Sequence, residues 1–191
     1  RRVAKMVYVE VDVLGRINID DIEEELIKAN GKIKVVTITG ASNVTGYITP
    51  IHDIARLAHK YGAVIIVDGA QLIAHREVNL AGNSKDEEID FLTFSAHKAY
   101  APFGSGAIVG KKDYLNEEDP FLSGGGCVAG VFDERLIWTA VPEKYEAGTQ
   151  NFFGAIAMAK ALSDLKNIGF QNIEMHEKLL VIGKKTSGTL Y

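Results

Sequence analysis

The sequence predicts an α/β fold built on a mostly parallel sheet with helices on both faces. Strand-like and helix-like segments alternate along the chain, which is the order typical of repeated β-α-β units. Residues 63–67 form a continuous apolar run, Ala-Val-Ile-Ile-Val, as expected for a strand that is covered on both sides. The composition agrees with a globular domain, because 47% of the residues are apolar and 24% are charged.

The first part of the chain predicts two strands with a helix between them. Residues 7–11 alternate β-branched and other side chains and predict a strand. A helix capped around Asn18 to Asp20 follows, with Asp20 and Glu23 at the spacing of a capping box, and Gly31 ends it. The expected apolar face of this helix consists of Ile22, Leu26 and Ala29. Residues 33–39 are rich in β-branched side chains and predict the second strand.

The next helix is predicted to begin at Thr49 and Pro50, because proline in the first helical position gives up an N–H that lacks a partner anyway. Gly62 closes this helix just before the strand at residues 63–67. Its inward-facing side chains are expected to be Ile51, Ile54, Leu57 and Ala58.

The rest of the chain predicts two further strands and two helices. The strands cover residues 91–94 and 107–109. Apolar positions recur at helical spacing over residues 152–168, where Gly169 stops the pattern, and a second helix is expected over residues 171–182. The apolar positions that recur at helical spacing in the first of these helices are Phe152, Ile156, Ala159, Leu162 and Leu165.

Polar residues follow two of the predicted strands. Asp68 comes directly after residues 63–67, and Ser95, His97 and Lys98 come directly after residues 91–94. Ligands of open α/β sheets bind beyond the carboxyl ends of the strands, so we expect both groups to meet at one crevice. A lysine amine held there can attack a carbonyl and form a Schiff base. The alternatives are that Asp68 only caps a helix and that Lys98 is an ordinary surface lysine.

The two segments together resemble the pyridoxal-phosphate signature of the class V aminotransferases, a family that includes the cysteine desulfurases. The resemblance rests on residues 67–71, Val-Asp-Gly-Ala-Gln, and on Ser-Ala-His-Lys at residues 95–98 with Gly104 and Gly106 after it. It extends from about residue 7 to about residue 180 and implies the large domain of a fold-type I enzyme. It also implies that Lys98 holds pyridoxal 5'-phosphate as an internal aldimine and then shuttles protons.

The resemblance assigns further contacts with the cofactor. Asp68 would keep the pyridine nitrogen protonated, and Gln71 and Asn43 would approach the phenolic oxygen of the ring. Ser95 and His97 would supply donors to the phosphate. The alternatives are that Gln71 is a solvated residue and Asn43 a turn residue, that Ser95 belongs to a simple turn, and that His97 is a buried histidine satisfied by a backbone carbonyl.

Residues 146–151, Glu-Ala-Gly-Thr-Gln-Asn, resemble the Glu-x-Gly-Thr-x-Asn segment of the family. In the family the threonine reaches the phosphate of the neighbouring subunit, so Thr149 implies a homodimer with shared active sites. The alternative is that Thr149 is the N-cap of the following helix. Gln150 stands where desulfurases often have proline, which weakens the motif.

The resemblance favours a cysteine desulfurase that converts L-cysteine to L-alanine and transfers the sulfur to an enzyme cysteine. A sulfur-acceptor protein is a possible further partner. The alternatives are an aminotransferase or another pyridoxal-phosphate lyase acting on a small amino acid, and a non-catalytic module with the same fold. The sulfur-accepting cysteine of the family lies in a C-terminal region, so Cys127 is interpreted as structural.

Several function classes are not supported by the sequence. The formal net charge is −4, with no long basic block, so nucleic acid is not an expected partner. No apolar run approaches the roughly 20 residues that span a bilayer, and His52, His59 and His176 lack the spacing of metal ligands. Residues 124–129 match a dinucleotide fingerprint only formally, since no strand precedes them and no helix pattern follows at once. A single cysteine fits a reducing cytoplasm.

We expect the chain to be a piece of a longer protein. It starts at Arg1 without methionine and stops just after a helical pattern. Residues 1–170 are assigned to a cofactor-binding large domain that is incomplete at its N-terminus, and residues 171–191 to a helix leading toward a missing C-terminal small domain. The 191 residues alone are expected to be inactive.

Overall fold

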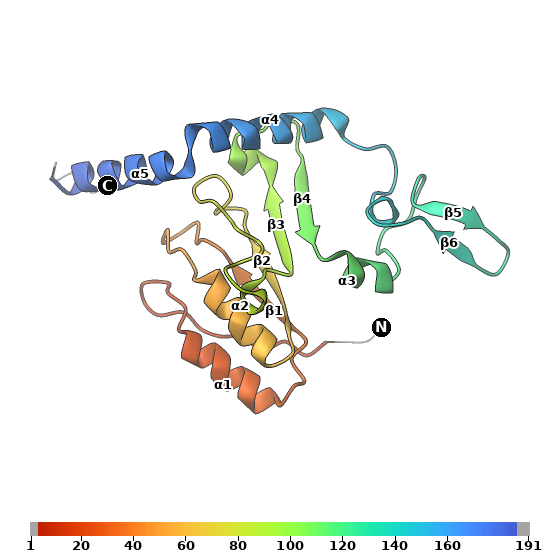
Figure 1. The fold of residues 1–191 in the computed structure, drawn as a ribbon, viewed down its shortest axis with the longest axis horizontal. Helices are drawn as coiled ribbons and strands as arrows, with labels where there is room; N and C mark the ends of the chain where they lie inside the picture. Colours follow the sequence, from red (N-terminus) through yellow and green to blue (C-terminus); the bar gives the residue numbers. More distant parts are fainter. Residues whose placement is uncertain (1–3, 187–191) are drawn as a thin grey trace.

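The computed structural model of the protein describes residues 4–186, with side chains as far as residue 182. A four-stranded sheet lies at its centre, with β1 (Val35–Thr39), β2 (Val64–Asp68), β3 (Phe91–Ser95) and β4 (Gly106–Gly110) in that order (Figure 1). The first three strands are parallel, and β4 pairs with β3 in the antiparallel sense. The predicted α/β fold with a mostly parallel sheet is confirmed.

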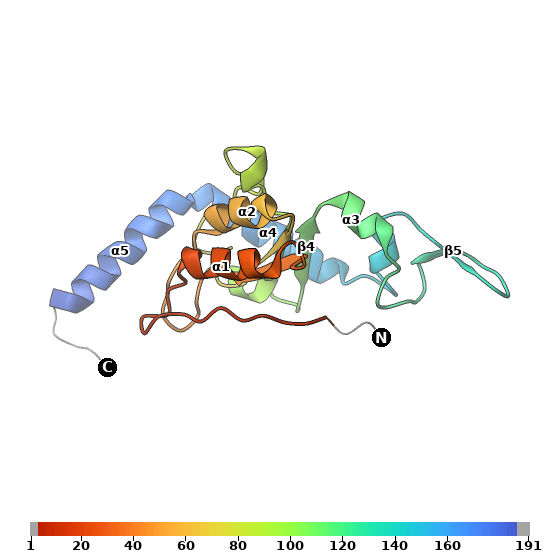
Figure 2. The same cartoon turned by 90° about the horizontal axis from the view of Figure 1, so that it is seen from below.

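Two helices, α1 (Ile19–Ala29) and α2 (Ile51–Lys60), pack against the sheet and form the main hydrophobic core with it (Figures 1 and 2). The buried side chains at the centre of this core are Ile22, Leu26, Ile54, Ala55, Ala58, Ile65, Val67 and Leu92. The predicted inward faces of both helices are therefore confirmed, although Ala29 is only half-buried. Asn18 is the N-cap of α1, within the expected capping region, whereas Pro50 is the residue before α2 and not its first residue.

The opposite face of the sheet is open within residues 4–182. Ile66 and Thr93 are half-buried there, and Ile108 is 69% exposed. Helices were expected on both faces of the sheet. Among the described residues, α1 and α2 cover one face, and no helix covers the other. The long helix α4 (Phe152–Ile168) instead crosses beyond the carboxyl end of β3, where it contacts the turn that follows this strand (Figure 1).

The strand expected at residues 7–11 is not formed. This segment has no neighbouring strand, and its only sheet-like contact is one isolated antiparallel bridge from Val11 to Ile17. Val7 and Tyr8 are 47% and 78% exposed. A high strand propensity reflects packing on a sheet surface, so it does not produce a strand where no sheet edge is in reach.

A β-hairpin that sequence reasoning missed extends away from the central sheet (Figures 1 and 2). It consists of β5 (Val128–Val131) and β6 (Leu136–Trp138), which pair in the antiparallel sense. The short helix α3 (Lys112–Glu117) lies between β4 and this hairpin. Three- and four-residue strands carry too little periodicity to stand out in a sequence.

The two C-terminal helices were predicted correctly. Asn151 caps α4, Gly169 ends it, and α5 (Phe170–Thr186) follows directly. The apolar stripe of α4 is buried only near its end, at Leu165, whereas Phe152 and Ile156 are 64% and 68% exposed. The last five residues of the expected segment 171–191 lie outside the described part of the chain. No helix within residues 4–186 has both the length and the apolar character needed to cross a membrane.

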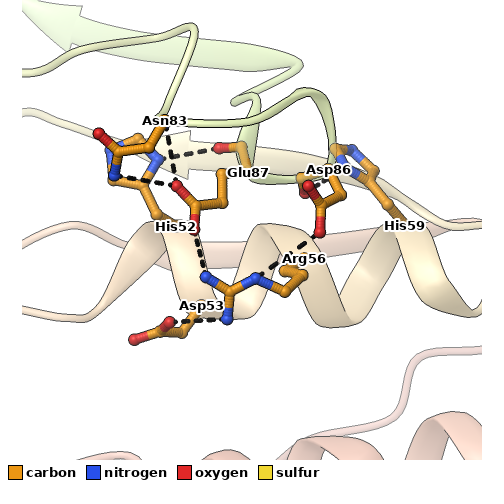
Figure 3. A network of polar contacts seen from close by, with 7 residues as sticks. All are labelled: His52, Asp53, Arg56, His59, Asn83, Asp86 and Glu87. Carbon is orange, nitrogen blue, oxygen red and sulfur yellow. Dashed lines mark hydrogen bonds and ion pairs between the residues drawn. The ribbon is translucent and has the colours of Figure 1, made fainter.

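One edge of α2 holds the segment that precedes β3 through polar contacts (Figure 3). The His52 Nδ1 atom donates to the Glu87 carbonyl at 2.9 Å, and the His59 Nδ1 atom donates to the Asp86 carbonyl at 2.8 Å. Arg56, which lies between the two histidines on the helix, forms ion pairs with the carboxylates of Glu87 and Asp86. The two histidines therefore attach the connection between β2 and β3 to α2. Residues 4–182 contain no cluster of three potential metal ligands.

Candidate functional site

An open hollow of about 430 Å³ lies over the carboxyl ends of β2 and β3. The strand register places Asp68 beside Thr93, and Thr93 beside Ile108, so these three residues form one row on the open face of the sheet. The residues that line the hollow are Asp68, Ala70, Thr93, Phe94, Ser95, Gly106, Ala107 and Ile108. The two predicted strand ends, marked by Asp68 and Ser95, therefore do meet at one crevice.

A second open hollow, of about 710 Å³, lies along α1 and α2 on the other side of the sheet. Its charged side chains already form pairs with one another. Lys60 contacts the Glu23 carboxylate at 2.6 Å, and Arg56 contacts the Asp53 carboxylate at 3.1 Å. Because these groups satisfy one another, we place the functional site at the strand ends.

Asp68 is the last residue of β2 and is exposed at the hollow. Its Oδ1 atom accepts a hydrogen bond from the Ala70 N–H at 2.9 Å, which caps a turn. The residues that follow form turns and no helix, so the helix cap that we considered for Asp68 is not formed. The Oδ2 atom has no partner among the described residues, which leaves one carboxylate oxygen available to a ligand.

Lys98 lies in a single 3-10 turn, η2 (Ala96–Ala99), directly after β3. Its side chain is half-buried, and the two alanines at the ends of the turn are fully buried. The Lys98 amine has no hydrogen bond or ion pair within residues 4–182. A half-buried lysine whose amine has no carboxylate partner among the described residues is available to a ligand.

The other predicted site residues lie at different distances from the hollow. His97 is exposed beside Lys98, and Gln71 is half-buried in the turn after Asp68. Asn43 is exposed in a turn that Ser42 holds, since the Ser42 Oγ atom accepts from the Val44 and Thr45 N–H groups at 3.2 Å each. None of these residues is part of the lining of the hollow. The structure therefore brings together Asp68 and Ser95, with Lys98 in the adjoining turn.

Thr149 is exposed in the loop before α4 and does not line the hollow. It is not the N-cap of the helix. That position belongs to Asn151, whose Oδ1 atom accepts from the Gly154 N–H at 3.0 Å. The capping alternative for Thr149 is therefore wrong, because the helix begins two residues later than a cap at Thr149 requires.

The loop after Lys98 is strained and is fastened to the start of α4. Tyr100 and Phe103 have φ angles of +65° and +73°, and residues other than glycine rarely adopt such positive values. The Asn151 side-chain amide donates to the Phe103 carbonyl at 2.6 Å, and the Ser105 hydroxyl donates to the Gly154 carbonyl at 2.9 Å. The start of α4 thus supports the loop that follows the Lys98 turn.

Sequence reasoning missed this supporting role of Ser105 and Asn151. A signal was present for Asn151, since it is the last residue of the Glu-x-Gly-Thr-x-Asn segment. No pattern along the chain pairs it with Phe103, because the two residues are 48 positions apart.

Cys127 has the structural role that we expected. It is fully buried, its Sγ atom donates to the Gly124 carbonyl at 2.9 Å, and it accepts from the Gly124 N–H at 3.1 Å. Strand β5 follows this glycine-rich loop directly. A dinucleotide fingerprint needs a helix N-terminus at this point, so the structure gives no support to that reading.

We expect Gly106→Ala to destabilise the sheet beside the hollow. A Cβ atom at this position would lie 2.8 Å from the Phe94 carbonyl oxygen on the adjacent strand. Relieving that contact must move β4 away from β3, at a cost of about 1–3 kcal/mol in unfolding free energy. Urea unfolding of the full-length protein measures the change. Gly125→Ala is the control, because a Cβ atom there meets nothing within 4 Å; equal effects of the two substitutions would contradict the close contact.

Comparison with known proteins identifies relatives over most of the chain. The family model "Aminotransferase class-V" matches residues 1–183. A cysteine desulfurase of Haloferax volcanii is 36% identical over 177 residues, which make up 93% of this chain and 40% of the relative. A cysteine desulfurase of Synechococcus elongatus is 35% identical over 179 residues, or 94% of this chain and 28% of the relative.

Solved structures give the same result for the fold. The apo structure of a cysteine desulfurase from Thermococcus onnurineus NA1 matches with a TM-score of 0.84 and 32% identity, over 95% of this chain and 44% of that one. The cysteine desulfurase CsdA of Escherichia coli matches with a TM-score of 0.81 and 28% identity, over 96% of this chain and 45% of that one. The chain therefore spans less than half the length of the proteins that it matches.

Proposed function

The chain belongs to the class V aminotransferase family, and from this premise we propose that the protein is a pyridoxal-phosphate-dependent cysteine desulfurase. In the proposed reaction L-cysteine is converted to L-alanine, and its sulfur passes to a cysteine thiolate of the enzyme. The observation that carries the proposal is the meeting of Asp68 and Ser95 at one hollow over adjacent strand ends, with Lys98 in the turn that adjoins it. The names of the relatives support the choice of reaction within the family.

The residues around the hollow suit pyridoxal phosphate. The Asp68 Oδ2 atom, which has no partner within residues 4–182, can pair with a protonated pyridine nitrogen. The Lys98 amine likewise has no competing partner within these residues. The Ser95 hydroxyl and the His97 imidazole can donate to a phosphate, since Ser95 lines the hollow and His97 follows it in the adjoining turn. When bound, the cofactor supplies an electron sink that stabilises negative charge at the substrate Cα atom.

The protein side chains have separate tasks in this proposal. Lys98 would hold the cofactor through its amine and would be placed to remove and return protons at the substrate. Asp68 holds the pyridine nitrogen in its protonated form. Gln71 and Asn43 orient the ring by donating to its phenolic oxygen. Because the hollow is open within residues 4–182, we expect the 191 residues alone to be inactive.

The sulfur-accepting cysteine is proposed to lie outside these 191 residues. The only cysteine of the chain, Cys127, is fully buried, and its thiol donates a hydrogen bond to the Gly124 carbonyl, which makes it a poor nucleophile. Helix α5 is proposed to lead toward a C-terminal domain that carries the acceptor. A cytoplasmic location and a sulfur-acceptor protein as the next recipient are parts of the same proposal.

Product analysis of the full-length protein tests the reaction. With pyridoxal phosphate and L-cysteine, a desulfurase forms alanine and reducible sulfur in equal amounts. Formation of a 2-oxo acid that requires an added 2-oxo acid as acceptor of the amino group would favour an aminotransferase, the alternative within the family. A protein that neither binds the cofactor nor consumes any small amino acid would be the non-catalytic module.

We expect the enzyme to be a homodimer in which Thr149 of one subunit contacts the cofactor phosphate of the other. Thr149 is exposed and lies apart from the hollow of its own subunit, which fits a contact in trans. Lys98→Ala and Thr149→Ala homodimers should both be impaired. In a mixed dimer one site has both defects and the other has neither, so mixing should restore part of the activity. Subunits that exchange without any gain over the parents would contradict the shared site.

A further inference from the structure

A buried carboxylate lies at the start of β3, at the end of the strand opposite the hollow. The side chain of Asp90 is 2% exposed. Its Oδ2 atom accepts from the Ile65 N–H and from the His59 Nε2–H, each at 2.8 Å. Its Oδ1 atom lies 2.6 Å from the Lys111 ammonium, and its backbone carbonyl accepts from the Lys111 N–H at 3.1 Å. One carboxylate therefore joins β2, α2 and the residue that follows β4.

The contact with Ile65 extends a short strand ladder. β2 and β3 pair over only three positions, from Ile66 with Phe91 to Asp68 with Thr93. The Asp90 carboxylate supplies a further rung before the first pair, and the Gly69 N–H donates to the Thr93 carbonyl at 2.8 Å after the last. In so short a ladder, the hydrogen bonds at the two ends contribute a large part of what holds the strand register. A slip by one residue would move every side chain of the strand to the other face of the sheet.

The charges around Asp90 favour its ionised form. Burial raises the pKa of the Asp90 carboxyl, but hydrogen bonds from Lys111, the Ile65 N–H and His59 outweigh burial and leave the pKa below its usual value. Burial lowers the pKa of the Lys111 ammonium, but its contacts with the Asp90 and Glu88 carboxylates outweigh burial, so the pKa of Lys111 is above its usual value. The Lys111 ammonium is shared between the Asp90 and Glu88 carboxylates, so loss of the Asp90 charge would leave it with one of its two ion pairs.

His59 connects this cluster to the segment before β3. Its Nδ1 atom faces the Asp86 carbonyl (Figure 3). Its Nε2 atom faces the Asp90 carboxylate, so the ring is held at both ends. Because Arg56 and His52 fasten the same segment to α2, the start of β3 is fixed relative to α2 as well as to β2.

We propose that Asp90 is a positioning residue for the cofactor site, because its carboxylate fixes the register between the strands that end in Asp68 and in the Ser95–Lys98 segment. The proposal rests on the proposed function, since it concerns the relative placement of the two cofactor-binding groups. Asp90 itself lies at the far end of β3 and does not line the hollow.

The chemistry of the cluster explains why a carboxylate is needed. Both Asp90 oxygens accept hydrogen bonds, one from two N–H donors and the other from the Lys111 ammonium. An asparagine offers one acceptor oxygen and one amide donor. If its oxygen keeps the contacts with Ile65 and His59, its amide faces the Lys111 ammonium, which is also a donor. Replacing Lys111 with glutamine removes this conflict, because the glutamine oxygen can accept from the asparagine amide.

The test uses the full-length protein with pyridoxal phosphate as the probe. We expect Asp90→Asn to raise the Kd for the cofactor about tenfold, the change that one charge-assisted hydrogen bond supports, and to speed hydrogen exchange at residues 64–68. The Asp90→Asn/Lys111→Gln double variant should return both quantities to within about threefold of the wild-type values. Ile22→Val, a core substitution in α1 outside the two strands, is the control for a general loss of stability.

Each outcome decides the matter. A wild-type Kd and unchanged exchange in Asp90→Asn would overturn the positioning role while leaving the proposed function intact. Equal weakening by Ile22→Val would show that stability alone controls cofactor binding and would overturn it too. If Asp90→Asn does not fold, the double variant must fold and bind with a near-normal Kd, and its failure overturns the proposal. A wild-type protein that binds no cofactor at all would remove the proposed function and this inference together.

Discussion

Replacing Lys98 with alanine in the full-length protein is expected to abolish the covalent attachment of pyridoxal phosphate. The Lys98 amine is half-buried in the turn after β3 and has no competing partner among the described side chains. A Schiff base with the cofactor absorbs visible light and becomes permanent on borohydride reduction. The substitution should therefore eliminate the visible band and the reduced adduct together, and turnover with them.

The loss should not come from unfolding. Lys98 contributes no hydrogen bond or ion pair within residues 4–182, so its removal should change the unfolding free energy by no more than about 0.5 kcal/mol. Lys112→Ala is a suitable control, since Lys112 is an exposed lysine at the start of α3. A borohydride-reducible adduct that persists in Lys98→Ala would assign the cofactor to a different lysine, and a loss in both variants would point to a general effect.

The placement of the site could be predicted because it depends on local patterns. A buried strand at residues 63–67 is visible as an apolar run, and Asp68 directly follows it. The same holds for β3 and Ser95. The carboxyl ends of parallel neighbours share one edge of a sheet, so two strand ends were enough to locate the hollow.

The supporting contacts could not be predicted, because they join residues that are far apart in sequence. Asn151 reaches the Phe103 carbonyl across 48 positions, and Asp90 reaches the Ile65 N–H across 25. Periodicity indicates which face of an element is apolar, and it does not identify the partner. The α4 stripe illustrates this limit, since Leu165 is buried while Phe152 remains exposed.

The second large effect is expected from Asp68→Asn, which should lower turnover by about 10²–10³-fold. A carboxylate keeps the pyridine nitrogen of the cofactor protonated, and an amide does not. The fold should be unaffected, because the asparagine oxygen can still accept the hydrogen bond that Ala70 donates to the Asp68 Oδ1 atom at 2.9 Å. Steady-state turnover and urea unfolding of the full-length protein give the two measurements.

Asp68→Ala distinguishes the effect of the charge from that of the turn cap, and Asp21→Asn is a control for loss of a carboxylate elsewhere. Asp68→Ala removes both the charge and the acceptor for Ala70, so it should lose turnover and also about 0.5–2 kcal/mol of stability, the usual cost of a lost side-chain cap. Asp21→Asn removes a carboxylate on the exposed side of α1 and should leave turnover unchanged. If Asp68→Asn retained near-normal turnover while Asp68→Ala was destabilised, the carboxylate would serve only the turn, and the cofactor contact assigned to Asp68 would be wrong.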